Sequence, residues 1–183
     1  MFPEIAKILV DEATIAQRVH AMGRQIAADL LADIERTGTD QIVLIPVLTG
    51  SIVFVADLIR QLPLKLRLGV VAVSSYPGRS MQSKGAALEG EIPRDLGGKH
   101  VLVVDDILDS GRTLGLVRRL IAEQRPASLR IAVLLRKVLS APRAEETPVE
   151  YIGFDIPDEF VVGYGLDYDG LYRNLPAIAV LRH

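Results

Sequence analysis

The stretch from Val101 to Leu114, VLVVDDILDSGRTL, constrains the fold of this chain more than any other segment. Four apolar residues run directly into two carboxylates, a third carboxylate follows at Asp109, and a Ser-Gly-Arg-Thr turn opens an amphipathic segment. This pattern predicts a buried strand, an acidic loop and the N-terminus of a helix. Free backbone N–H groups and the positive dipole end of such a terminus bind anions, and the hydroxyls of Ser110 and Thr113 add donors.

The carboxylates beside this predicted anion site need a role of their own, because they would otherwise repel a phosphate. Carboxylates in that position can accept hydrogen bonds from ribose hydroxyls, take part in the shell of a Mg²⁺ ion or transfer a proton. A phosphate cradle with carboxylates next to it therefore predicts a phosphorylated sugar as the ligand.

Helix-like and strand-like runs alternate on both sides of this stretch. An apolar stripe from Ile15 to Ile34 predicts a helix that ends near Thr37-Gly38, and the continuous apolar run Gln41–Leu48 predicts a strand buried on both faces. Further predicted elements are a helix at about 52–62, a strand at 66–75, a helix at 114–124 and a strand at 129–135. This alternation predicts an α/β fold, a mostly parallel central sheet flanked by helices. Ligands of such a fold bind at the carboxyl ends of its strands.

Two segments depart from the alternation. Residues 76–98 are rich in glycine and proline and predict a long loop with at most a short hairpin, which is either a disordered connector or an active-site lid. Short strand-like runs from 149 onward predict a small hood over the crevice, followed by a returning strand at 177–181. For a chain of 183 residues we expect one domain, with a core at about 38–148 and 177–183 and a hood at about 149–176 that includes part of the N-terminal segment.

Composition and missing motifs exclude several classes of protein. A net charge of -2 lacks the basic excess of typical nucleic-acid binders, and the absence of cysteine excludes disulfides, thiolate zinc sites and cysteine nucleophiles. No uncharged run approaches the ~18 residues of a membrane span. We therefore expect a cytoplasmic protein without nucleic-acid or membrane partners. Neither a P-loop nor a dinucleotide motif is found in the sequence, and the three scattered histidines receive no role.

The sequence VLVVDDILDSGRTL resembles the phosphoribosyl-diphosphate (PRPP) loop of type I phosphoribosyltransferases. Lys137 after LLR and the stretches IPVLTGSIVFVADLIR, VAVSSY and YIGFDIPDEFVVGYGLDYDGLYRNLP resemble the hypoxanthine and hypoxanthine-guanine members. The resemblance covers most of the chain from about Ile42 onward. It implies transfer of a ribose phosphate from PRPP to N9 of a 6-oxopurine, with release of pyrophosphate.

The resemblance assigns the PRPP side of the site by position. The 5′-phosphate would be held by Ser110, Gly111, Arg112 and Thr113. The ribose hydroxyls would face Asp105 and Asp106, where the family usually has a Glu-Asp pair. The pyrophosphate would meet Arg173 and the turn of Thr49 and Gly50, although the family commonly has Lys or Arg in place of Thr49. The peptide before Thr49 is often cis in this family.

The resemblance also assigns the purine side. Asp109 would act as the acid/base residue near purine N7, and Lys137 would donate to the 6-oxo group. The base would stack on Phe160 and meet main-chain atoms of Val161. Mg²⁺ is the implied cofactor, with Asp167, Asp105 and Asp106 as its carboxylates, and Asp167 also borders the purine. Ser75 and Tyr76 would begin a mobile lid, and the implied assembly is a homodimer or homotetramer.

The same residues distinguish the expected transferase from rival functions. A pyrimidine-operon RNA-binding regulator carries a similar phosphoribosyl loop, but its loop typically lacks an acid at the position of Asp109 and it lacks the PDEFVVGYGLDY segment. An adenine phosphoribosyltransferase is disfavoured by Asp109, Lys137 and the C-terminal segment. The preference among hypoxanthine, guanine and xanthine stays open, because the 2-position of the base, at which hypoxanthine and guanine differ, is read largely by main-chain groups.

Overall fold

The computed structural model describes residues 4–74, 87–88 and 91–182. The strands are β1 (Ile5–Val10), β2 (Ile42–Leu48), β3 (Leu66–Leu68), β4 (Val71–Ser74), β5 (Ala87–Leu88), β6 (His100–Leu108), β7 (Ser128–Val138), β8 (Tyr151–Pro157), β9 (Val161–Val162) and β10 (Ile178–Leu181). The helices are α1 (Glu12–Thr37), α2 (Ile52–Ile59) and α3 (Arg112–Ala122). In the described part of the chain, no helix has the length and apolar character needed to span a membrane.

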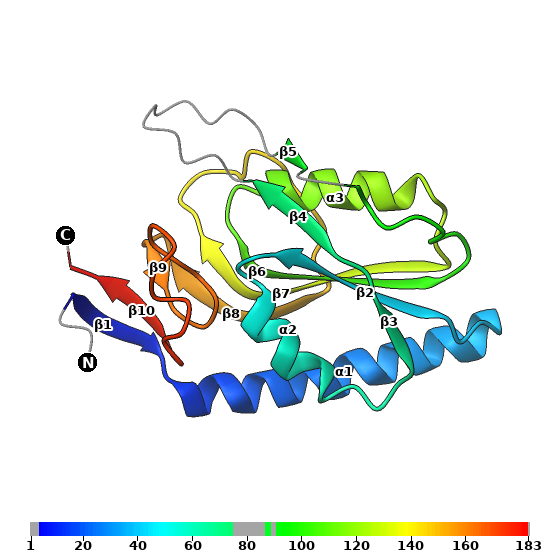
Figure 1. Ribbon diagram of the computed structural model, residues 1–183, viewed down its shortest axis with the longest axis horizontal. Helices are drawn as coiled ribbons and strands as arrows, with labels where there is room; N and C mark the ends of the chain where they lie inside the picture. The colour runs from blue at the N-terminus through cyan, green and yellow to red at the C-terminus, as the bar shows by residue number, and fades with distance from the viewer. Residues whose placement is uncertain (1–3, 75–86, 89–90, 183) are drawn as a thin grey trace.

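The main sheet has the order β5-β4-β2-β6-β7-β8, with β3 also paired to β2. All of these pairs are parallel except β4–β5. Helices α1 and α2 cover one face of the sheet and α3 covers the other (Figure 1). The predicted α/β class with a mostly parallel sheet is therefore confirmed. Because β2, β6 and β7 lie between helices, they are buried on both faces, which explains their continuous apolar sequences.

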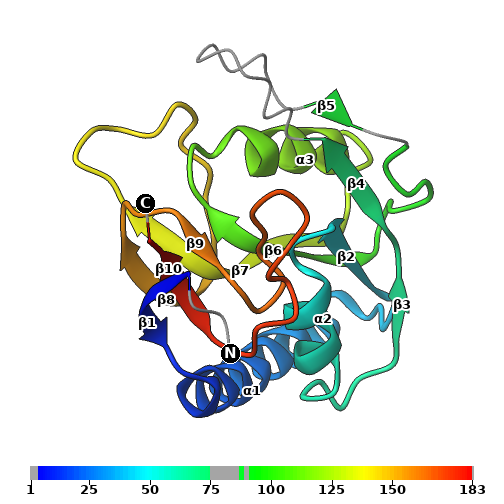
Figure 2. The same ribbon diagram turned by 60° about the vertical axis from the view of Figure 1, so that its left-hand side comes forward.

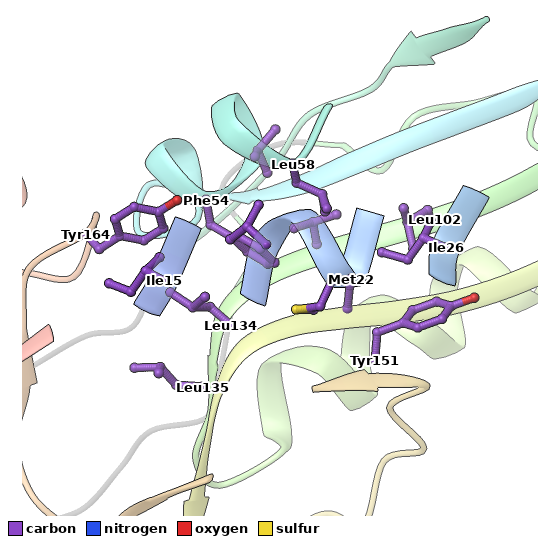
Figure 3. Packing of buried hydrophobic residues seen from close by; sticks show 14 of the residues in the cluster. Ile15, Met22, Ile26, Phe54, Leu58, Leu102, Leu134, Leu135, Tyr151 and Tyr164 are labelled. Carbon is purple, nitrogen blue, oxygen red and sulfur yellow. The ribbon is translucent and has the colours of Figure 1, made fainter. Parts of the chain in front are cut away.

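Helix α1 forms where the apolar stripe predicted it. Asp11 caps its N-terminus by accepting a hydrogen bond from the Thr14 amide at 2.8 Å, and Gly38 ends it in the left-handed conformation. The stripe packs against α2 and the central strands, where it forms the larger core of the protein (Figure 3). Labelled members of this core are Ile15, Met22, Ile26, Phe54, Leu58, Leu102, Leu134, Leu135, Tyr151 and Tyr164.

The small sheet has the order β1-β10-β9 and is antiparallel. The predicted division between core and hood is wrong at two strands. The residues of β8 belong to the main sheet, where β8 pairs in parallel with β7, while the returning strand β10 lies between β1 and β9. Local apolar patterns predict that such strands exist but not which neighbour supplies their hydrogen bonds, so sequence alone misassigned both.

Two further boundaries differ from expectation. Strand β6 continues to Leu108, so Asp105 and Asp106 lie within the strand and not in an acidic loop. The single strand predicted at 66–75 is two short strands, β3 and β4, both of which pair with β2. They are separated at Gly69, whose amide donates to the Leu44 carbonyl at 2.9 Å.

Asp33 links α1 to β7 and predicts an acid-sensitive contribution to stability. The carboxylate is 5% exposed and accepts hydrogen bonds from Arg36, at 2.9 Å, and from Arg130. Burial alone would raise the pKa of Asp33, but the two guanidinium partners outweigh it and leave the pKa lowered. A lowered folded-state pKa means that the stabilisation is present above the unfolded-state pKa and is lost as pH falls through the folded value.

We expect Asp33→Asn to reduce the free energy of unfolding by about 1–3 kcal/mol at neutral pH, because it leaves two cations with a neutral partner. Urea unfolding across pH measures this, with the exposed Asp40→Asn as control. The difference between wild type and Asp33→Asn should begin to shrink near about pH 4, where the carboxylate of the unfolded chain takes up a proton, and should vanish as pH falls through the lowered pKa of the folded state. A difference that stays constant with pH would contradict the electrostatic account.

Candidate active site

A cleft of about 990 Å³ opens at the carboxyl ends of β2, β4 and β6. The cleft is bordered on its far side by the segment between β9 and β10, which lies beside α2 (Figure 2). Tyr164 ties that segment to the helix by donating its hydroxyl to Asp57 Oδ2 at 2.5 Å. The lining residues are Val47, Leu48, Thr49, Gly50, Val73, Asp105, Asp106, Ile107, Leu108, Asp109, Ser110, Gly111, Thr113, Leu114, Phe160, Asp167, Tyr168, Asp169 and Arg173.

Asp105 and Asp106 form an adjacent acidic pair that lines the cleft. Asp105 is 6% exposed, and its Oδ1 accepts the Asp106 amide at 2.9 Å. Burial raises the pKa of Asp105 well above its usual range, and the neighbouring charge of Asp106 adds to the effect. Burial also raises the pKa of Asp106, although hydrogen bonding and the charge of Arg173 offset part of it. Such a pair favours a partner that brings protons or positive charge, such as sugar hydroxyls or a cation.

The turn after β2 packs directly on this pair. The peptide between Leu48 and Thr49 is cis, a point that the sequence left open. A Cβ added at Gly50 would lie 1.7 Å from Asp106 Oδ2, so only glycine allows this approach. The turn and the acidic strand end therefore form one wall of the cleft.

The loop before α3 has the geometry of an anion site. Gly111 lies in the left-handed region at φ 82°, and α3 begins at the next residue. Ser110 and Thr113 both line the cleft beside this helix N-terminus. The loop is braced from behind, because the Ser110 carbonyl accepts the amide of Glu145 at 3.1 Å. Backbone N–H groups at the start of a helix can hold a phosphate here without a basic side chain.

Lys137 stands at the end of β7 between two carboxylates. Its Nζ lies 3.3 Å from Asp109 Oδ2 and 3.2 Å from Asp158 Oδ1. The side chain of Lys137 is 14% exposed, whereas those of both acids are more than half exposed. The strand register explains the meeting, since Leu108 pairs with Arg136 and Lys137 pairs with Ile156. Three neighbouring strand ends thus bring the three charges together.

The segment around β9 supplies aromatic and charged groups opposite this cluster. Phe160 and Tyr168 meet edge to face, with ring centroids 5.6 Å apart and an interplanar angle of 81°. Both are about half exposed and line the cleft, so their faces remain accessible to a flat ligand. Asp167 and Arg173 form an ion pair at 2.6 Å, and Arg173 also donates to the Gly165 carbonyl at 2.6 Å.

Most of the residues predicted from sequence meet in this cleft. Those that line it are Thr49, Gly50, Asp105, Asp106, Asp109, Ser110, Gly111, Thr113, Phe160, Asp167 and Arg173. Lys137 reaches its edge through Asp109, while Arg112 and the buried Val161 are not among the lining residues. The predicted lid residues Ser75 and Tyr76 lie outside the described residues.

Sequence reasoning assigned no role to several residues at or beside the cleft, including the following four. Ile107, Tyr168 and Asp169 line it, and Asp158 pairs with Lys137. Three of them belong to the quoted motif stretch YIGFDIPDEFVVGYGLDYDGLYRNLP, so the motif located them without giving them roles. Asp158 could have been suspected as an acid two residues before the predicted stacking residue.

The donor set suits Mg²⁺ that is shared with a ligand. Within the described ranges, no group of three or more His, Asp or Glu side chains is arranged to hold a metal by itself. The cleft instead presents the Asp105–Asp106 pair and the separate Asp167. Mg²⁺ is commonly bound by one or two carboxylates together with substrate phosphates and water. The residues therefore fit an ion that a diphosphate would complete.

Comparison with known proteins places the chain in a family. Residues 17–169 match the model of the family described as "Phosphoribosyl transferase domain". The chain is 41% identical over 180 residues to the hypoxanthine-guanine phosphoribosyltransferase of Mycobacterium tuberculosis, an alignment that covers 97% of this chain and 87% of that protein. It is 40% identical over 172 residues to the hypoxanthine phosphoribosyltransferase of Escherichia coli, with 94% and 93% covered.

Solved structures agree with these relatives. A hypoxanthine phosphoribosyltransferase from Trypanosoma cruzi, in a ternary complex with substrates, superposes with a TM-score of 0.86 at 38% identity, covering 99% of this chain and 97% of that one. A hypoxanthine-guanine phosphoribosyltransferase from Bacillus anthracis gives a TM-score of 0.82 at 36% identity, covering 98% and 100%. The chain therefore belongs to the phosphoribosyltransferase family, in its hypoxanthine and hypoxanthine-guanine branch.

Proposed function

We propose that this protein transfers the 5-phosphoribosyl group of PRPP to N9 of hypoxanthine or guanine, forming IMP or GMP and releasing pyrophosphate. The observation that carries the proposal is that a helix-terminal anion loop, a carboxylate and an aromatic ring line one cleft, with a lysine paired to that carboxylate at its edge. The anion loop suits the phosphorylated donor, and the other three groups suit a flat acceptor with a carbonyl oxygen and a proton to lose. Purine salvage is the corresponding role in the cell.

On the donor side, the backbone amides at the start of α3 and the hydroxyls of Ser110 and Thr113 would hold the 5′-phosphate. Asp105 and Asp106 would accept hydrogen bonds from the ribose hydroxyls, a role that suits acids whose pKa burial raises, because hydroxyl donors compensate the desolvated charge. Arg173 would meet the pyrophosphate from across the cleft, together with the turn at Thr49 and Gly50.

On the acceptor side, Phe160 would stack on the purine and Lys137 would donate to its 6-oxo group. Asp109 would accept the proton that the purine loses as N9 attacks the anomeric carbon, and its charge would stabilise positive charge on the ribose. Asp105, Asp106 and Asp167 would hold Mg²⁺ jointly with PRPP. When bound, the ion would neutralise charge that develops on the departing pyrophosphate.

The donor half of the proposal is tested by incubating the purified protein with PRPP, Mg²⁺ and hypoxanthine. We expect pyrophosphate and IMP to appear in equal amounts, and no pyrophosphate without a base. Pyrophosphate release that does not depend on the base would indicate simple hydrolysis of PRPP and would refute a transferase.

We also expect a homodimer or homotetramer in the cytoplasm, and sedimentation as a monomer would refute that assembly.

Lys137→Met should lower kcat/KM for hypoxanthine by about 10²-fold and leave any trace activity with adenine nearly unchanged. The reason is that an ammonium donor can pair with a 6-oxo group, whereas an exocyclic amino group offers it no acceptor. Steady-state kinetics with both bases give the ratio. An unchanged preference for hypoxanthine would show that another group reads the 6-position.

A further inference from the structure

Asp158 is a charged residue at the purine end of the cleft without an assigned role. Its carboxylate lies as close to the Lys137 ammonium as that of Asp109, at 3.2 Å and 3.3 Å respectively. The side chain of Lys137 is 14% exposed, so its ammonium is largely removed from water and lies beside these two acids. Within the part of the chain that the structure describes, they are the carboxylates with which it forms ion pairs.

The backbone fixes Asp158 in this position. Asp158 is the first residue after β8, which ends at Pro157. It lies two residues after Ile156, which pairs with Lys137 across the two strands. The turn that carries it is held by a hydrogen bond from the Glu159 amide to the Pro157 carbonyl at 2.8 Å. Glu159 of the same turn forms an ion pair with Lys7 of β1 at 2.8 Å, but the Lys7 side chain is half exposed, so this pair contributes little to holding the turn. Phe160 lies on the same segment, so the charge and the candidate stacking ring are carried together.

Once a purine binds, Asp109 and Asp158 can no longer both act as counter-charges of Lys137. Asp109 must then turn to the proton of the base, which removes one of the two negative charges beside the ammonium. A mostly buried ammonium left without a counter-charge is unfavourable, and breaking its last ion pair would oppose purine binding. Asp158 is not among the residues that line the cleft, so it has no such second task toward the donor or the base.

We propose that Asp158 is a positioning residue for purine recognition: it holds the Lys137 ammonium in place, directed at the 6-oxo group, while Asp109 turns from Lys137 to the base. This inference rests on the proposed function. It distinguishes the two acids that flank Lys137, one of which contacts the reacting base while the other acts only through the lysine.

Asp158→Asn should raise KM for hypoxanthine roughly two- to fivefold, the range expected for loss of a half-exposed ion pair. KM for PRPP and kcat should change little, because neither the phosphate loop nor Asp109 is altered. Glu159→Gln is the matched control, since it removes a carboxylate from the same turn without touching Lys137. Asp158→Glu, which restores the charge, should recover most of the lost affinity.

A double-mutant cycle separates positioning from a general effect on the turn. In the Lys137→Met background, Asp158→Asn should cause no further rise in KM for hypoxanthine, because there is no ammonium left to position. An equal rise in both backgrounds, or the same rise with Glu159→Gln, would overturn the inference. The affinity of each variant for IMP, measured by calorimetry, should follow the same pattern.

The outcomes for the inference and for the proposed function are distinct. A wild-type protein that turns over hypoxanthine while Asp158→Asn keeps the wild-type KM refutes the positioning role alone. A wild-type protein that neither turns over any 6-oxopurine nor binds IMP refutes the function, and the inference falls with it.

Discussion

Asp109→Asn is expected to lower kcat with hypoxanthine by about 10²- to 10⁴-fold, the usual contribution of a general acid or base. The substitution keeps the size of the side chain but removes the charge and the proton acceptor. Asp109 lines the cleft, and its Oδ2 lies 3.3 Å from the ammonium that would read the same base. Because the ion pair of Asp109 is made with Lys137 of β7 and not with the loop before α3, KM for PRPP should stay within about twofold of wild type.

The control for this variant is Asp169→Asn, which removes a carboxylate from the same cleft at a position without an assigned role. Its kcat should remain near the wild-type value. If Asp109→Asn lost PRPP affinity and turnover to the same extent, the residue would be a structural cap of the loop before α3 and not a participant in proton transfer.

Gly111→Ala should raise the dissociation constant for PRPP by about 10²-fold or more, since a displacement of about 1 Å in a positioning loop is enough for such a loss. Gly111 adopts φ 82°, and an added Cβ would lie 1.9 Å from the Glu145 carbonyl oxygen. That oxygen belongs to the backbone of the segment that braces the loop, so it cannot move away as a flexible side chain could. The loop before α3 must shift, and with it the amides that would hold the 5′-phosphate.

Gly98→Ala isolates the cost of the backbone conformation from the cost of the clash. Gly98 also has a positive φ, at 67°, but an added Cβ would meet no described heavy atom within 4 Å. It should lose roughly 1–2 kcal/mol of stability and keep its PRPP affinity. Calorimetric titration with PRPP and urea unfolding of both variants make the comparison. Equal PRPP affinity in the two variants would mean that the loop before α3 does not bind the donor.

The parts of the fold that follow from local sequence were predictable. The apolar stripe of α1, its Gly38 terminus and the fully buried β2 each leave a periodic signal. The partners of β8 and β10 leave none, because a short apolar strand fits equally well beside several neighbours. The extension of β6 through Asp105 and Asp106 was missed for another reason: carboxylates are rare in a central strand and are kept there by the demands of the site.

The candidate site also has one part that could be predicted from local sequence and one part that could not. The anion loop could be predicted from physical principles, since glycine, hydroxyl residues and a helix start stand next to one another in sequence. The purine end depends on residues far apart along the chain, and only the resemblance brought Lys137 and Phe160 into the site. Neither the physical principles nor the resemblance pointed to Asp158, because its role depends on its distance to Lys137 across β7 and β8.

The most direct test of the whole account is a panel of acceptors. The purified protein is supplied with PRPP, Mg²⁺ and, separately, hypoxanthine, guanine, xanthine and adenine, and nucleotide formation is followed for each base. The arrangement of Lys137, Asp109 and Phe160 predicts efficient conversion of hypoxanthine, guanine or both, and at most trace conversion of adenine. Failure to form a nucleotide from any 6-oxopurine, or a preference for adenine, would contradict it.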